Sequence, residues 1–125
     1  METKIKKSDF LNLLRWTQGI AERRSTMQVL SNLLIEVVDK ILKVTATDLE
    51  IVLTAEGVIE GKGSTKWCIN SRHLYEIVKE APAEELRLIP SDAHGLEIVS
   101  GKAQFRMVGM NPEDFPALPQ VASKL

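Results

Sequence analysis

The most regular pattern in the chain is an alternation of apolar and polar positions between residues 29 and 60. Its period of two and its richness in Val, Ile and Leu are typical of strands, and it predicts strands at about 29–38, 41–47 and 49–60. Asp39 and Lys40 separate the first two strands by the length of a tight hairpin turn. Asp48 follows the second strand, where we expect it to bond its own backbone in the next reversal.

Two other segments, residues 8–19 and 71–82, change to the period of a helix. Each places four residues at i, i+3, i+4 and i+7, which predicts a buried stripe. The stripes are Phe10, Leu13, Leu14 and Thr17 in the first segment, and Leu74, Ile77, Val78 and Ala81 in the second. We predict that Ser8 and Ser71 cap the two helices, and that Gly19 and Pro82 end them.

The order of elements repeats along the chain. Strands are predicted at residues 2–7 and 65–70, before each helix, and three short strands follow the second helix, at about 84–90, 95–99 and 102–108. Strand, helix and three strands therefore occur twice, offset by about 62 residues. This order predicts an α+β fold of residues 1–108, with two helices packed on antiparallel sheets. Residues 109–125 hold three of the five prolines and no periodicity, so they predict an extended segment that starts a linker.

Composition narrows the class of protein. The chain has 125 residues, of which 44% are hydrophobic and 26% charged, with a formal net charge of −1. That is the composition of one ordinary folded domain. No apolar run approaches the roughly 20 residues of a membrane helix, and the start METKIKKSDF lacks the apolar core of a signal peptide, so we expect a cytoplasmic protein. Cys68, the single cysteine, lies in an apolar strand pattern and reads as a buried thiol.

Asp48 and Glu50, with Asp39 nearby, raise the question of a catalytic pair. A general acid–base pair needs a cleft and perturbed pKa values, and nothing in the neighbouring sequence supplies them. On the strand pattern, Asp48 belongs to a turn and Glu50 points to solvent. A small hydrolase built on these two acids stays an alternative, and it would require a pocket with a carboxylate of raised pKa.

The solvent faces of the predicted helices carry basic side chains. Arg72, Glu76 and Lys79 follow one another at i, i+4 and i+7 opposite the apolar stripe, and Arg15 lies on the first helix. If the helices pack side by side, their outer faces form one modestly basic surface, which suits contacts with phosphate that do not read sequence. Solvated surface charge is the alternative explanation.

Several motifs together carry a resemblance to a known family. They are VLSNLLIEV, LKVTATDLEI and FRMVGMNPEDFPALP, with Thr47-Asp48-Leu49-Glu50 and Asp114-Phe115-Pro116 as signatures. The chain resembles, over essentially its whole length, the N-terminal domain of the bacterial DNA polymerase III beta subunits, the replicative sliding clamps.

The resemblance implies a DNA clamp fold and a protein that tethers rather than catalyses. Family members have three similar domains, and two chains close head to tail into a ring around duplex DNA, with helices lining the hole. The clamp makes DNA polymerase III processive, and a clamp loader opens the ring with ATP. The resemblance implies no cofactor, metal or catalytic residue. It also implies that this chain is a first domain, without the second and third domains and the peptide pocket between them.

Site residues follow from the same resemblance. Arg24 matches the family's DNA-contacting arginine in the loop after the first helix, and Arg72 and Lys79 match basic positions on the helix that faces the hole. Arg23 and Arg15 are added for their position and charge alone.

The predicted subunit interface has an apolar and a polar part. Phe105 and Met107 match edge-strand positions that receive the neighbouring subunit, and Ile77 looks like part of the same pocket; plain core residues are the alternative. His73 and Lys102 match positions that make polar contacts across the interface.

Some residues depart from the family or need no function. Gln28 stands where many members have proline, and Lys40 where the hairpin often has glycine. Trp16 and Trp67 read as packing residues. A free-standing interaction module with the same architecture is a further alternative, and it would add a partner strand at the edge near Phe105.

Overall fold

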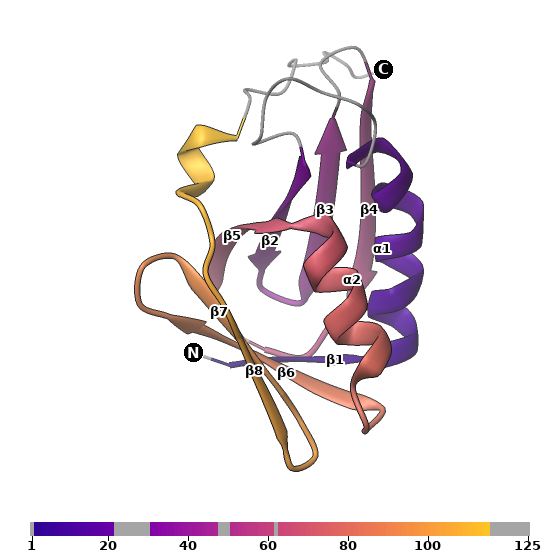
Figure 1. Cartoon of the computed structure of the whole chain (residues 1–125), viewed down its shortest axis with the longest axis vertical. Coiled ribbons are helices and arrows are strands. Elements are labelled where there is room, and N and C mark those ends of the chain that lie inside the picture. The colour runs from indigo at the N-terminus through magenta and orange to yellow at the C-terminus, as the bar shows by residue number, and fades with distance from the viewer. Residues whose placement is uncertain (1, 22–30, 48–50, 62, 116–125) are drawn as a thin grey trace.

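The computed structural model describes residues 2–21, 31–47, 51–61 and 63–115, and Figure 1 shows their arrangement. They form two helices and two antiparallel four-stranded sheets, which confirms the predicted α+β class. The first half of the chain contains β1 (Thr3–Lys6), α1 (Lys7–Ala21), β2 (Asn32–Val38), β3 (Ile41–Thr47) and β4 (Val52–Val58). The second half contains β5 (Ser64–Asn70), α2 (Ser71–Glu80), β6 (Glu85–Ser91), β7 (Gly95–Ser100) and β8 (Ala103–Met107).

The two halves exchange their first strands. One sheet has the order β1-β6-β7-β8 and the other β4-β3-β2-β5, so each meander takes its fourth strand from the other half of the chain. Ile5 of β1 lies opposite Leu86 of β6, and Ile35 of β2 lies opposite Trp67 of β5. The exchange ties the halves into one folding unit, because neither sheet is complete without a strand from the other half.

One continuous core lies between the sheets and the helices. Alternate residues of the strands, such as Ile35 and Leu88, are fully buried in it with the helix residues Phe10 and Leu74. Trp67 is buried among them, and its indole nitrogen donates a hydrogen bond to the carbonyl of Gly95 at 3.1 Å. This partner satisfies the polar group that a buried tryptophan carries. Trp67 is therefore a packing residue, as predicted.

Trp16 contradicts the same prediction. Its side chain is 70% exposed on α1, so it does not pack in the core. The i, i+3, i+4, i+7 stripe of α1 already points Phe10, Leu13 and Leu14 inward, and position 16 falls outside that stripe. Hydrophobicity alone misplaced this residue, whereas the helical period places it correctly.

The helix ends differ from those predicted. α1 begins at Lys7 and passes through Gly19, so Ser8 is not the cap and Gly19 is not the end. Instead Glu84, just before β6, caps α1: its carbonyl accepts from the Lys7 N–H at 2.6 Å, and its Oε2 accepts from the Ser8 N–H at 3.1 Å and the Ser8 hydroxyl at 2.7 Å. A residue 76 positions away in the sequence does what Ser8 was predicted to do.

α2 is capped one residue earlier than predicted. The Asn70 side chain accepts a hydrogen bond from the His73 N–H at 3.0 Å, and Ser71 is the first helical residue. Ala81 is extended at the C-terminal end, as expected for a residue before proline.

The predicted hairpin at Asp39 is confirmed, since Val38 pairs with Ile41 and Asp39 adopts a positive φ of 55°. Asp48, Glu50 and Gln28 lie outside the described residues.

The chain after β8 returns to the sheet of β5. Met110 bridges Cys68, and Asn111 caps a short 3₁₀ helix, η2 (Pro112–Asp114), by accepting from the Glu113 N–H. Phe115 is then buried against Leu34 and Cys68. This packing holds residues 110–115 against the domain. The predicted division of the chain at residue 109, with a linker beginning there, stays a prediction.

Candidate nucleic-acid and subunit interfaces

The first candidate surface is the outer face of the two helices, which lie side by side (Figure 1). Arg15 on α1 and Arg72 and Lys79 on α2 are all exposed. Their helices bury the opposite face, which carries Leu14 on α1 and Val78 on α2. The amphipathic pattern therefore presents these cations to the solvent, as the sequence predicts.

Glu76 offsets one of the three cations on the described part of this surface. Arg72 Nε lies 3.8 Å from Glu76 Oε2, with both side chains more than 60% exposed. An exposed pair of this kind contributes little to stability, and it leaves Arg72 available to exchange Glu76 for a phosphate. Arg23 and Arg24, the other predicted contacts, lie outside the described residues.

The second candidate surface is a hollow of about 290 Å³ between α2 and the edge strand β8. Ile77 and Phe105 line it, and both are half-buried at the margin of the core. His73 borders it on the helix. The structure thus brings together three of the five residues predicted for the subunit interface.

The other two interface residues lie elsewhere. The side chain of Met107 is only 8% exposed and belongs to the core, which was the alternative to an interface position. Lys102 lies in the exposed turn between β7 and β8 and does not line the hollow. Met107 still contributes the backbone of the edge strand, through which a partner strand would bind.

Sequence reasoning missed the acidic part of this hollow. Glu76 and Glu80 line it with His73 and Ile77. These four residues follow the spacing i, i+3, i+4, i+7, so the helical period contained the signal as a second stripe beside the buried one. Glu76 had been assigned only to the basic face of α2.

The edge of β8 gives this hollow a second binding element. Among the described strands, β8 pairs only with β7, so its outer backbone groups face away from the sheet. An unpaired edge is a template for another strand, and a neighbouring apolar hollow selects the side chains that this strand carries.

Cys68 does not add a reactive site. Burial raises the pKa of its thiol, although a hydrogen bond from Asn32 Nδ2 at 3.6 Å acts in the opposite direction. A buried thiol with a raised pKa is a poor nucleophile, because the thiolate is the reactive form.

No helix in the described part of the chain is long and apolar enough to cross a membrane.

Comparison with known proteins assigns the family. The model of the family described as DNA polymerase III beta subunit, N-terminal domain, matches residues 1–119. The beta sliding clamp of Chlamydia pneumoniae is 30% identical over 127 residues, which cover 100% of this chain and 34% of that protein. The chain therefore spans about a third of the length of this relative.

Solved structures agree with the family model. The pol III beta of Caulobacter crescentus is 30% identical, with a TM-score of 0.87 over 96% of this chain and 33% of its own. The beta subunit from the DNA polymerase of Streptococcus pyogenes has a TM-score of 0.93 over 100% of this chain and 34% of its own; at 16% identity it shows the fold alone. Because the family model matches nearly the whole chain, the chain belongs to the DNA polymerase III beta subunits, in their N-terminal domain.

Proposed function

We propose that this chain is the first domain of a DNA sliding clamp, the processivity factor of a bacterial replicative DNA polymerase. The observation that carries the proposal is the family match over residues 1–119. Relatives of this chain carry the name beta sliding clamp. In the whole protein, two copies close head to tail into a ring around duplex DNA.

The helix face is the surface that we assign to DNA. Arg15, Arg72 and Lys79 are exposed cations on neighbouring helices, and Arg23 and Arg24, which follow α1 in the sequence, are the other two residues that we assign to DNA. Flexible cations hold phosphates at many equivalent positions along a duplex, so the protein stays on DNA and still slides. The domain alone is expected to bind duplex DNA weakly, without preference for sequence.

The hollow beside β8 is the surface that we assign to the partner subunit. A strand of the second copy adds to the free edge of β8 and inserts an apolar side chain between Ile77 and Phe105. His73 borders this contact, and Lys102 meets the partner from the turn. Alone, the domain is expected to self-associate through the same edge at high concentration.

The remaining parts of the proposal concern partners and chemistry. The full-length protein works with DNA polymerase III and with a clamp loader in the cytoplasm. It needs no cofactor and has no catalytic site of its own, since its task is to form a closed ring. The clamp loader supplies the ATP that opens this ring.

The deciding experiment uses the full-length gene product. The protein is loaded on nicked circular DNA with a clamp loader and ATP, and the DNA is then linearised. Retention on circles with loss from linear ends supports the ring. Retention that does not depend on DNA topology contradicts it, because ordinary surface binding would then be enough.

Two variants separate the surfaces in that protein. Phe105→Arg is expected to break the dimer in sedimentation, while Ile41→Arg on the outer face of β3 leaves it intact. The triple change of Arg15, Arg72 and Lys79 to Ala is expected to shorten retention and to flatten the dependence on salt by up to about 0.9 per lost phosphate contact. Lys43→Ala and Lys66→Ala, in the sheet β4-β3-β2-β5, are the matched controls. If they shorten retention on DNA as much as the triple change does, the assignment of the helix face to DNA is contradicted.

A further inference from the structure

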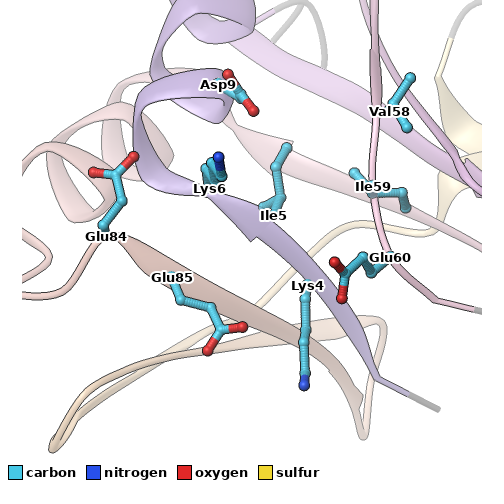
Figure 2. A pocket seen from close by; sticks show the side chains of 9 residues that line it. All are labelled: Lys4, Ile5, Lys6, Asp9, Val58, Ile59, Glu60, Glu84 and Glu85. Atoms are coloured by element: carbon cyan, nitrogen blue, oxygen red, sulfur yellow. The ribbon is translucent and has the colours of Figure 1, made fainter.

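A second hollow, away from both proposed surfaces, lies where the two sheets meet. It has a volume of about 360 Å³, and Figure 2 shows the side chains around it. β1 contributes three of these residues, and the end of β4 with the residues after it contributes Val58, Ile59 and Glu60. The backbone holds this corner together: Lys4 and Glu60 exchange N–H···O bonds of 2.8 and 3.0 Å.

The apolar part of this hollow continues onto the surface. Ile5 and Ile59 are buried behind it, whereas Val58 is 74% exposed. Val58 lies opposite Ile41, and Ile41 lies opposite Val38, so three exposed apolar side chains form a row across β4, β3 and β2. Isolated exposed apolar residues are ordinary, but a row that runs into a hollow marks an interaction surface.

The rim of the hollow is acidic. It carries four carboxylates and two lysines, a net charge of −2: Asp9, Glu60, Glu84, Glu85, Lys4 and Lys6. Each lysine has one acid directly across the strands, Glu85 opposite Lys6 and Glu60 opposite Lys4. Asp9 and Glu84 are therefore the surplus, and they lie at the α1 end of the hollow (Figure 2).

Local contacts keep Glu84 negative. The Ser8 hydroxyl and N–H donate to Glu84 and lower the pKa of its carboxyl group. The Lys7 ammonium donates to the carbonyl of Ala81 at 2.8 Å, and its positive charge, with that of Lys6, also favours the ionised form of Glu84. The positive N-terminal end of α1 acts on both carboxylates, because Asp9 lies in its first turn and Glu84 accepts a hydrogen bond from the Ser8 N–H.

We propose that this corner docks an extended peptide segment of a partner protein that carries basic residues followed by alternate apolar side chains. The basic residues lie against Asp9 and Glu84, one apolar side chain enters the hollow beside Val58, and the next covers Ile41. The acidic rim argues against nucleic acid as the occupant. Alternate spacing is required because side chains of an extended chain share a face at every second residue. The proposal is independent of ring formation and of DNA binding.

The test uses the ¹⁵N-labelled chain and the capped pentapeptide Arg-Lys-Leu-Ser-Val. We expect saturable amide shifts centred on residues 4–9, 38–41, 58–60 and 84–85. Replacing Leu and Val of the peptide by Ser, or Arg and Lys by Glu, should weaken binding at least about tenfold, which corresponds to about 1.4 kcal/mol. Shifts that follow acidic residues over the whole surface, or a Ser peptide that binds equally well, would overturn the proposal.

Protein variants give the second arm of the test. Asp9→Asn and Val58→Ser change exposed side chains, so both variants are expected to fold, and each should weaken peptide binding by about threefold to tenfold. Val108→Ser, at an 85% exposed residue outside the hollow, is the matched control and should bind as the unchanged chain does. The titration is then repeated on the full-length gene product. If the full-length gene product does not bind the peptide, the rest of the chain covers the corner, and the proposal that it docks a separate partner is overturned.

Discussion

The two edge strands, β4 and β8, occupy corresponding places in the two halves, but they meet their helices differently. α1 lies directly against β4, where Leu13 packs so close to Gly57 that a Cβ on the glycine would be 3.2 Å from its methyl carbon. Between α2 and β8 the corresponding space is the hollow of about 290 Å³ beside Ile77 and Phe105.

The difference comes from the size of side chains on alternate positions of the two edges. Toward its end, β4 carries Ala55 and Gly57, so the helix approaches the strand closely. β8 carries Phe105 and Met107, which keep the helix away from the strand and leave Phe105 half-buried. The same architecture thus yields one edge that its helix closes and one edge that keeps a hollow beside its helix.

The test with the largest expected effect compares the second residue of each apolar stripe, Leu13 on α1 and Ile77 on α2. Leu13→Ala should lower the free energy of unfolding by about 2–5 kcal/mol, because it empties a buried site that the close contact with β4 cannot refill. Ile77→Ala should cost less than about 2 kcal/mol, because its side chain already borders an open hollow. Urea denaturation of both variants measures the two values. Equal losses would mean that the α2 edge is as closely packed as the α1 edge.

The second test fills the closed edge. Gly57→Val should lower the free energy of unfolding by about 1–3 kcal/mol, because its methyl groups would overlap Leu13. The double variant with Leu13→Ala should recover part of that loss, since the smaller residue makes room. If the losses of unfolding free energy simply add in the double variant, the contact with Leu13 is not what restricts the size of the side chain at position 57.

The repeat of architecture was predictable, whereas the exchange of strands was not. Period-two and helical patterns lie within single segments, so the strand of residues 41–47 and the stripe of Leu74 and Val78 follow from local sequence. Nothing in a short strand such as residues 3–6 specifies a partner strand that lies 79 to 85 positions away, so its pairing with β6 depended on tertiary packing.

In the candidate sites, too, some features followed from local sequence and others depended on tertiary packing. The exposure of Arg15, Arg72 and Lys79 followed from helical spacing. The burial of the Met107 side chain did not follow from the sequence, because strand alternation does not say which face of an edge strand is covered, and its role in the subunit interface stays a prediction. The corner beside Val58 was missed because its residues come from three separate segments of the chain.

The third test concerns the start of α2. Asn70→Ala should lower the free energy of unfolding by about 1 kcal/mol, since it removes the side chain that accepts from the His73 N–H. Ser71→Ala should be nearly neutral or stabilising, because its buried hydroxyl has no partner among the described residues. If Ser71→Ala lowered the free energy of unfolding more than Asn70→Ala, Ser71 and not Asn70 would be the cap of α2.

The smallest expected effect is a dependence on pH at the start of α1. The folded-state pKa of Glu84 is lowered by its bonds from Ser8, so this contact stabilises the fold above the ordinary glutamate value of about 4.3. The contribution is lost as the pH falls through the folded-state pKa. Ser8→Ala should therefore lower the free energy of unfolding slightly at pH 7 and leave it unchanged near pH 2, in urea denaturation series at both values. Both side chains are exposed, which keeps the effect small. Ser64→Ala, at an exposed residue of β5, is the matched control. A difference between Ser8→Ala and the unchanged chain that persists at pH 2 would mean that the hydroxyl acts through the helix backbone and not through the carboxylate.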